Sequence, residues 1–299
     1  MTQQVLDAGV EAKIGKIVGG ISNLPTPPIV FTQIQKVLNN PNTSAFDVAA
    51  ILQEDPAISA KVLKLTNSAY YGLPKEVESV RQAVVIVGLE AIKNLVLSAS
   101  VFEAFSSGNI DKEYQDLFWR HSLGTAFAAR LLAHKMKATA VFDGEAAFSG
   151  GMLHDIGKMV ISVYMPEEAK KIKELKDQLK EKPDHAIEEQ VLGYNHTQVG
   201  ALLAREWKLP QKLVEAISYH HFPQLNDSDN NLPYLISMAN FLTHLTFDYD
   251  PEENNYVEPI EDGVYNFVGT TKEHLIDCTD LLREEYGKSE TFMAMAKGM

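Results

Sequence analysis

The sequence predicts an all-α protein built from many helices. Apolar residues recur at helical spacing through most of the 299 residues, and Gly, Pro or polar residues separate these stretches. The two-residue alternation that is typical of a sheet is confined to a weak "VYNFVG" at residues 264–269. No internal repeat is visible, so we expect one helical assembly rather than an array.

The N-terminal third predicts four helices. Ser44 is expected to cap the first, and Asp55-Pro56 to start the second, with Asp as the cap and Pro in the first turn. The turn "NSAYYGLP" ends that helix. "SVRQAVVIVG" and "LEAIKNLVLSASVFEAF" then predict two helices around Gly88, and the second is apolar enough to be largely buried.

A polar stretch at residues 106–113, "SSGNIDKE", predicts a subdomain boundary. Helix-length periodicity follows in "YQDLFWRHSLGTAFAARLLAHKM", "GEAAFSGGMLHDIGKMVISVYM", "PEEAKKIKELKDQLKE", "HAIEEQVLGYNHTQVGALLAREW" and "PQKLVEAISYHH". After the loop "QLNDSDNNL", "PYLISMANFLTHLTF" and "TKEHLIDCTDLLREEYG" predict two more helices. We divide the chain into an N-terminal helical part (1–110), a helical core (111–245) and an acidic C-terminal extension with a terminal helix (246–299).

Composition restricts the classes of function. The net charge is −13, and from residue 225 onward 15 Asp and Glu face 4 Lys and Arg. With no basic stripe to follow a phosphate backbone, we expect no nucleic-acid partner. No apolar run reaches the ~18 residues of a membrane helix, and the first residues lack a signal-peptide layout. A single cysteine, Cys278, excludes an internal disulfide and favours a cytoplasmic protein.

A His-Asp pair inside an apolar run is the strongest sign of chemistry. "GGMLHDIGKMVI" contains His154 and Asp155, and a buried carboxylate needs a partner. On one helix the two side chains would diverge by about 100°, so they could serve two adjacent metal positions. Imidazole and carboxylate together suit Fe, Mn, Zn or Ni, which the sequence does not distinguish.

The nine histidines fall into two groups. His121, His196 and the His220-His221 pair also lie in or at the end of apolar helices in the middle of the chain. We interpret the remaining four as structural or surface residues, because an isolated His on a helix is more often that than a ligand: His134, His185, His244 and His274. Walker A, GxGxxG, GxSxG and HExxH motifs are absent, and Cys278 is expected to be a buried structural cysteine.

The sequence "HDIGK" resembles the signature of the HD superfamily, metal-dependent phosphohydrolases with a helical fold. Further segments narrow the resemblance to the HDOD family, the HD-related output domain of bacterial signalling proteins, over roughly residues 15–245: "NLPTPP", "LQEDPAISAKVLKLTNSAYYG", "SVRQAVVIVGLEAIKNLVL" and "VGALLAREWKLPQKLVEAISYHH". The resemblance implies an HD-type helical bundle with an N-terminal helical subdomain. It also implies a regulatory role.

The chain also resembles the related HD-GYP phosphodiesterases in "FWRHS", "LHDIGK", "NHTQVGA" and "YHHFP". This resemblance implies that Asp155 bridges two divalent cations, one held by His121 and His154 and the other by His196 and His220. His221 would bind an additional metal or the phosphate of a substrate. Lys158 would either contact a phosphate oxygen or be a solvated helix cation.

The chain departs from the HD-GYP pattern at three points. Asn240, in "SMANFL", stands where the last Asp is expected, and a neutral amide is a poor substitute for a metal-binding carboxylate. Leu117 stands where a Glu is expected four residues before His121, and no Gly-Tyr-Pro follows the His-His pair. These departures argue against cleavage of cyclic dinucleotides.

Two functions remain open. The first is a signal-transduction module with an HD-type metal-binding site, whose N-terminal helices present a surface to a signalling protein. The second is a metal-dependent phosphohydrolase acting on a nucleotide or other phosphate ester, with Asp155 and Lys158 as catalytic residues. The ligand set favours the second, whereas Asn240 and the HDOD resemblance favour the first. We expect a signalling protein or a small phosphorylated ligand as partner, and no membrane.

Overall fold

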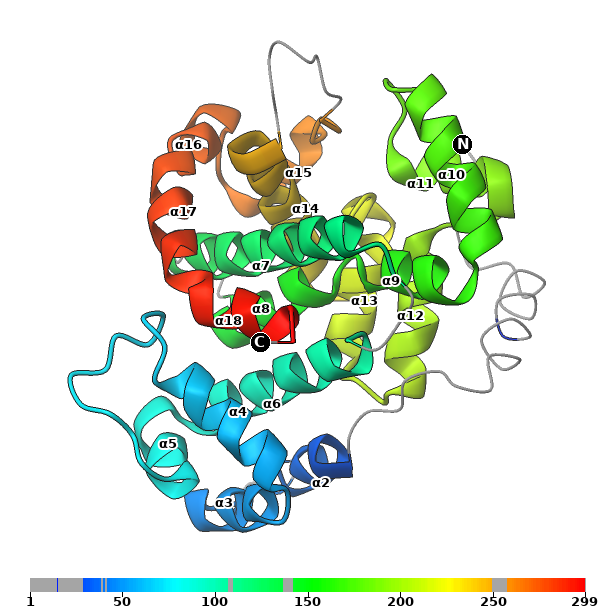
Figure 1. Cartoon of the computed structure of the whole chain (residues 1–299). Helices are drawn as coiled ribbons and strands as arrows, with labels where there is room; N and C mark the ends of the chain where they lie inside the picture. Colours follow the sequence, from blue (N-terminus) through cyan, green and yellow to red (C-terminus); the bar gives the residue numbers. More distant parts are fainter. Residues whose placement is uncertain are drawn as a thin grey trace. The chain divides into compact units, whose positions relative to one another are not determined.

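The computed structural model describes residues 29–106, 110–136, 142–248 and 257–298, except residues 39 and 41, together with residue 15. Every element in these ranges is a helix, which confirms the predicted all-α class (Figure 1). Two compact units are present: a larger unit (Met1–Leu24 and Asn109–Arg283) and a smaller unit (Pro25–Gly108 and Glu284–Met299). None of the described helices is both long and apolar enough to span a membrane.

Among its described residues, the smaller unit contains five α-helices from the N-terminal part of the chain and one from the C-terminal end: α2 (Ile29–Leu38), α3 (Ala45–Gln53), α4 (Pro56–Thr66), α5 (Val80–Val87), α6 (Leu89–Ala104) and α18 (Glu290–Ala296). Ser44 forms a capping box at α3, and Asp55 accepts the backbone N–H groups of Ala57 and Ile58 at α4, so both predicted caps are confirmed. Residues 91–102 of α6 are buried except at one position, Lys93. Helix α2 was not predicted.

The larger unit carries the helices of the candidate site: α7 (Lys112–Lys135), α8 (Gly144–Leu153), α9 (Ile156–Tyr164), α10 (Pro166–Gln178), α11 (Asp184–Leu192), α12 (His196–Glu206), α13 (Gln211–Tyr219) and α14 (Leu232–Thr243). A 3-10 turn, η1 (Pro223–Leu225), follows α13, and a π-helical turn, η2 (His244–Asp248), follows α14. Helix α7 packs on α8 and α14, while α12 packs on α9 and α13.

The C-terminal part is also helical. It contains α15 (Asp262–Val268), α16 (Lys272–Ile276), α17 (Thr279–Tyr286) and the 3-10 turn η3 (Gly287–Ser289). The weak strand pattern "VYNFVG" therefore lies in a helix, because its alternation is too short to outweigh local helical contacts. Cys278 is buried, as predicted, and its thiol contacts the carbonyl oxygen of His274.

Three stretches predicted as single helices are each divided in two. "TKEHLIDCTDLLREEYG" is interrupted at Asp277-Cys278. The helix containing His196 breaks where Gly193 adopts φ +81° and ends α11, after which Asn195 caps α12 with a capping box. The third break separates His154, at the end of α8, from Asp155, at the start of α9. The His-Asp pair therefore lies at a junction between two helices. The two side chains diverge because the backbone changes direction there, in addition to the rotation between successive residues of a helix.

Two glycines of "GGMLHDIGK" permit close helix packing around this junction. A Cβ added to Gly157 in α9 would overlap the carbonyl oxygen of His196 and lie 2.8 Å from the backbone nitrogen of Gly200 in α12. A Cβ on Gly151 in α8 would lie 2.5 Å from the carbonyl oxygen of Thr125 in α7. The two close approaches bring α7, α8, α9 and α12 together at the His154-Asp155 junction.

Candidate metal centre

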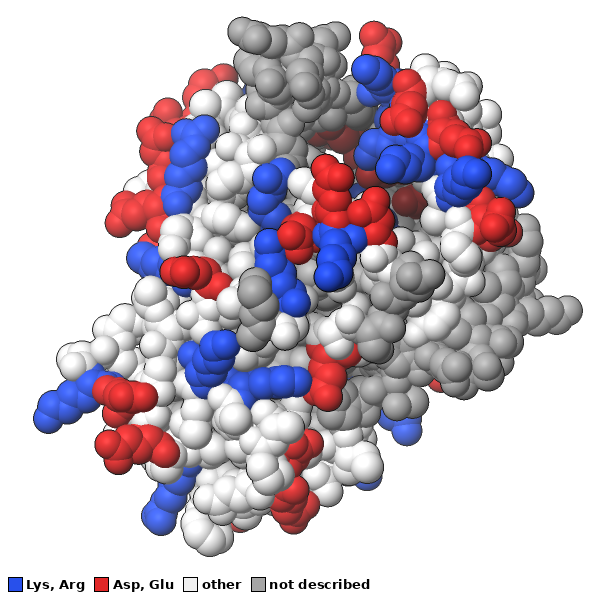
Figure 2. Space-filling view, in the orientation of Figure 1, with Lys and Arg blue, Asp and Glu red and all other residues white. Residues whose placement is uncertain are grey.

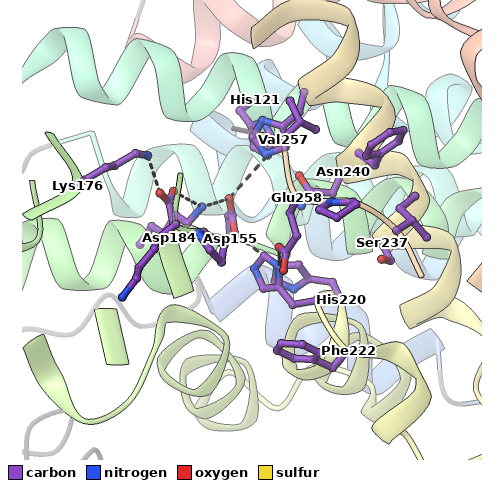
Figure 3. Close-up of a pocket in the computed structure, with 18 of the residues that line it drawn as sticks. His121, Asp155, Lys176, Asp184, His220, Phe222, Ser237, Asn240, Val257 and Glu258 are labelled. Carbon is purple, nitrogen blue, oxygen red and sulfur yellow. Dashed lines mark hydrogen bonds and ion pairs between the residues drawn. The ribbon is translucent and has the colours of Figure 1, made fainter. Parts of the chain in front are cut away.

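Six side chains predicted from the sequence as metal ligands meet in the larger unit, around the carboxylate of Asp155. They come from α7, the α8–α9 junction, the first residue of α12 and the end of α13: His121, His154, Asp155, His196, His220 and His221. Figure 3 shows Asp155 between His121 on one side and His220 on the other. Asp155, His154 and His196 are almost completely buried, so the groups meet in a low-dielectric setting.

The imidazoles divide between the two oxygens of Asp155. Oδ2 lies 3.7 Å from Nε2 of His121 and 3.4 Å from Nε2 of His154. Oδ1 lies 3.1 Å from Nε2 of His196 and 3.6 Å from Nε2 of His220. In each set, extended by His221 in the second, the donor atoms lie within 4.8 Å of one another. The structure thus groups these residues in two ligand sets that share Asp155; their role as ligands stays a prediction.

Three of the imidazoles are oriented by a hydrogen bond at Nδ1, the ring nitrogen on the side away from Asp155. Nδ1 of His154 contacts the carbonyl oxygen of Gly151 at 2.7 Å, and Nδ1 of His220 contacts that of Ile217 at 3.0 Å. Nδ1 of His196 contacts a carboxylate oxygen of Glu188 at 2.7 Å. Since these oxygens accept hydrogen bonds, each Nδ1 carries the proton. Each Nε2 then faces Asp155, and a neutral ring offers it as a lone pair, the arrangement found in histidines that bind metals.

Two polar atoms at the centre lack the partner that burial demands. Nε2 of His220 and Oδ1 of Asn240 make no hydrogen bond to any described residue. Nε2 of His121 lies 3.3 Å from Nε2 of His154, a contact in which two lone pairs would face each other unless a proton or a cation intervenes. The donor set of imidazoles and one carboxylate therefore fits divalent transition-metal ions, and the group is able to hold a metal.

Electrostatic coupling controls the charges of the centre. Burial by itself raises the pKa of Asp155, but His154, Lys158 and His196 outweigh it and hold that pKa well below its usual range. Burial lowers the pKa of His196, yet Glu188 and Asp155 together raise it to about 9. Burial lowers the pKa of His220 to about 3. These pKa values make Asp155 negatively charged, His220 neutral and His196 positively charged, with both ring nitrogens protonated, at neutral pH when no cation is bound.

Lys158 belongs to a chain of ion pairs. Its ammonium lies 2.8 Å from Oδ2 of Asp155 and 3.1 Å from Oδ2 of Asp184, and Asp184 continues to Lys176 at 2.6 Å. The Lys158 side chain is only 16% exposed, which differs from a solvated helix cation. Its charge is shared between two carboxylates, so any phosphate contact would compete with Asp184 and Asp155.

A cleft of about 870 Å³ opens onto the centre. Asn240 from α14 and Leu117 from α7 line this cleft, and Leu117 is 48% exposed. An amide and an aliphatic side chain therefore stand at the two positions where the HD-GYP pattern has carboxylates. Lys176, Lys180 and Lys182 line the side formed by α10 and the turn after it. Figure 2 shows basic and acidic side chains interleaved over α10, so this wall has mixed rather than uniformly positive charge.

Sequence reasoning missed three residues beside the centre. Glu188 is 4% exposed and accepts hydrogen bonds from both the backbone N–H and Nδ1 of His196, at 2.7 Å each. A glutamate on the buried face of α11 was its only signal. Glu258, 2.7 Å from Nδ1 of His221, lies far along the chain. His185 is an isolated histidine in the sequence, a pattern that predicts a structural or surface residue. Their proximity depends on tertiary packing.

The other histidines lie as follows. His134 and His274 are exposed, as expected of surface residues. The ring of His244, in η2, lies 4.4 Å from the ring of His121 and therefore contributes to the wall of the centre.

Comparison with known proteins places this site in a family context. A family model for the HDOD domain matches residues 24–223. An uncharacterized protein of Treponema pallidum (strain Nichols) is 28% identical over 221 residues, which are 74% of this chain and 42% of that protein. The chain thus spans less than half the length of this curated relative.

Three crystal structures are similar over most of the chain. A Shewanella amazonensis SB2B protein, provisionally named a phosphohydrolase, is 26% identical with a TM-score of 0.70, covering 94% of this chain and 97% of that one. An HDOD domain protein of unknown function from Geobacter sulfurreducens is 23% identical with a TM-score of 0.73, covering 98% of this chain and 99% of that one. A Marinobacter aquaeolei VT8 protein, provisionally named a signal transduction protein, is 21% identical with a TM-score of 0.76, covering 99% of this chain and 67% of that one. The last two support the fold alone.

Proposed function

Since the chain belongs to the HDOD domain family, we propose that it is a regulatory signal-transduction module whose His-Asp centre binds divalent cations. One observation carries the proposal: His154, His196 and His220 are each held from behind through Nδ1, so that Nε2 is directed at Asp155. Such preorientation lowers the cost of assembling a metal site.

Two positions for cations follow from the two oxygens of Asp155. His121 and His154 would serve the first, and His196 and His220 the second. A bound cation would supply positive charge to an otherwise buried carboxylate and polarise a water or an anionic ligand from the cleft. Fe, Mn, Zn and Ni all remain compatible with this donor set.

Asn240 supports a regulatory rather than a catalytic role. Its amide brings no charge, and Lys158 already pairs with Asp155, so little net negative charge remains for one or two divalent cations. Weaker retention of the metal suits a site that responds to cation or ligand concentration. It suits less well a centre that must hold a metal through repeated turnover.

A protein partner is supported by the surface of the smaller unit. Phe46 of α3 is 62% exposed, and Val85 and Ile86 of α5 are 69% and 47% exposed. Helices α3 and α5 pack together, so these apolar side chains belong to neighbouring elements. Apolar side chains that form a contiguous exposed patch mark sites of protein interaction. We propose that a signalling protein binds there.

Elemental analysis tests metal binding. The full chain, purified without chelator and reloaded with Mn²⁺, Zn²⁺, Fe²⁺ or Ni²⁺, is expected to retain cation in stoichiometric amounts. Asp155→Ala is expected to lose the cations at the centre. His134→Ala, which removes an exposed imidazole, is the matched control and should retain the wild-type content. Wild-type protein that stays metal-free after reloading would contradict the proposal.

The second candidate is a metal-dependent phosphohydrolase acting on a nucleotide or other phosphate ester. The observation that favours it is the open cleft, whose lysines at positions 176, 180 and 182 lie on the approach to Asp155. Cationic side chains beside a metal centre suit an anionic substrate. A phosphatase screen with Mn²⁺ should then show activity in the wild type and none in Asp155→Ala. Equal activity in both would rule the centre out as its source.

A further inference from the structure

A second cluster of donor atoms lies beside the centre. It joins His185 of α11, His221 after α13 and Glu258 of the segment before α15, and all three offer a donor atom within 4.8 Å of the others. Figure 3 shows Glu258 reaching toward His220, the residue that follows α13. Only His221 is shared with the ligand sets around Asp155.

His185 is the residue whose surroundings need explaining. It is 6% exposed, and its Nδ1 makes no hydrogen bond to any described residue. Its ring packs on that of His221 at 4.5 Å, and Phe222 contacts it edge-on at 5.2 Å. A buried ring nitrogen without a partner is unfavourable, and the centre at Asp155 makes no use of it.

A carboxylate oxygen of Glu258 lies close to this nitrogen. Oε2 of Glu258 lies 3.7 Å from Nδ1 of His185 and 2.7 Å from Nδ1 of His221. Two donor atoms that each bind one zinc ion at about 2.0–2.2 Å lie roughly 3–3.7 Å apart. The Glu258–His185 separation already has that length, and the His221 contact reaches it with a small movement of the carboxylate.

We propose that His185, His221 and Glu258 form a side site for a zinc-class divalent cation, separate from the centre at Asp155. Two imidazoles and one carboxylate are a known three-residue set for zinc, which leaves a further position for water or a ligand. Glu258 is 30% exposed and lines the cleft, so the open position faces solvent.

The side site is linked to the centre through one imidazole. When Nδ1 of His221 binds the side cation, the proton of this neutral ring lies on Nε2, which is 3.1 Å from Nε2 of His196. That proton is donated to His196 only while Nε2 of His196 is unprotonated and binds no cation. The side site and the centre therefore meet at the contact between His196 and His221.

The side site depends on residues outside the family match. Glu258 lies beyond residues 24–223, and its segment is anchored where the ring of Phe267 in α15 stacks on Tyr234 of α14 at 3.9 Å. The neighbouring Glu261 also accepts a hydrogen bond from Gln224. These contacts hold the segment against the end of α13, where His221 lies.

Zinc stoichiometry of the full chain tests the proposal. Protein loaded with Zn²⁺ and freed of excess by gel filtration is analysed by plasma mass spectrometry. His185→Gln and Glu258→Gln are each expected to hold one equivalent fewer than the wild type. Asp155→Asn is expected to retain the side equivalent, and His134→Gln to match the wild type. A His185→Gln variant that binds as much zinc as the wild type would overturn the side site.

Other outcomes are equally decisive. If Asp155→Asn abolishes all zinc binding, the side site is refuted while the centre stands. If Glu258→Gln weakens binding without changing the number of equivalents, and His185→Gln has no effect, Glu258 only orients His221 and the side site is refuted. Should His185→Gln fail to fold by circular dichroism, the partly exposed Glu258→Gln decides, with loss of one equivalent as the supporting result.

Discussion

Gly157 in α9 and His196 in α12 touch backbone to backbone, so closely that a single methyl group at residue 157 would overlap the carbonyl oxygen of His196. This contact places the junction that carries Asp155 against the first residue of α12. The glycine of "HDIGK" therefore acts through helix packing, and its effect is to bring a carboxylate and an imidazole within 3.1 Å.

Replacement of Gly157 by alanine is expected to displace α12 and impair the centre. Overpacking of this kind costs about 1–3 kcal/mol, and here the obstacle is backbone that cannot rotate away. We expect a corresponding loss in the free energy of unfolding in urea, together with reduced metal content.

The matched control is Gly263→Ala. Apart from the adjacent residues and the backbone of α15 itself, no atom of a described residue lies within 4 Å of a Cβ at this position. Alanine favours a helix over glycine by up to about 1 kcal/mol, so stability should hold or rise. Wild-type stability and metal content in Gly157→Ala would show that the two helices can separate at no cost.

Asn240→Asp is expected to strengthen metal binding at the centre. The substitution adds a carboxylate to the wall of the cleft where Oδ1 of Asn240 makes no hydrogen bond to a described residue. An added ligand charge should raise affinity roughly tenfold or more, equivalent to about 1.4 kcal/mol. Competition with a chromogenic chelator measures the change.

Asn266→Asp makes the same charge change on an exposed position of α15. It should leave the affinity unaltered. If both variants bind alike, residue 240 takes no part in the centre.

Metal affinity should rise with pH. Glu188 and Asp155 raise the pKa of His196 to about 9 against the effect of burial, so below that pH a cation must displace a proton from this ring. Between pH 6 and 8, the apparent affinity for Mn²⁺ is expected to increase about tenfold per pH unit for this one proton. Titration calorimetry in buffers of different ionisation enthalpy would count the protons released.

The variant Glu188→Gln removes the largest influence that raises this pKa. We expect the pH dependence to shift to lower pH in this variant. An affinity that does not vary with pH in the wild type would contradict the assignment of His196 as a ligand.

Asp143 should make stability depend on acid pH. Burial raises its pKa, but the hydrogen bond from Lys212 and those from the backbone N–H groups of Ala146 and Glu145 outweigh it, so the pKa lies below 3.8. Because the folded pKa is the lower one, the stabilisation is complete above 3.8 and is lost as pH falls through the folded value.

Asp143→Ala should cost about 0.5–2 kcal/mol near neutral pH through loss of the cap of α8. Its unfolding free energy should approach that of the wild type in acid. Urea unfolding of both proteins at pH 3 and pH 7 measures this convergence, and a constant difference would show that charge plays no part.

The all-α class, the caps at Ser44 and Asp55 and the residue types of the centre are visible in the sequence, because periodicity, capping and a buried His-Asp pair are local patterns. The family resemblance also rests on contiguous segments and is confirmed by the match to residues 24–223. Helix α2 and the three divided helices were missed, since apolar periodicity continues across a break that one cap or one left-handed glycine creates.

Spacing along the chain carried no information on what surrounds the ligands. Glu188 supports His196 from another helix, and Glu258 reaches His221 across 37 residues. The sequence around His185 gives no sign of a special role. Tertiary packing places its Nδ1, which makes no hydrogen bond to a described residue, 3.7 Å from a carboxylate oxygen of Glu258. Local sequence therefore determined the all-α class, most of the helices and the residue types that supply donor atoms. Only the tertiary structure decided which donor atoms lie close together. Their proximity depends on how tightly helices pack at positions far apart in the sequence, as at Gly157, where the absence of a side chain lets α9 approach α12.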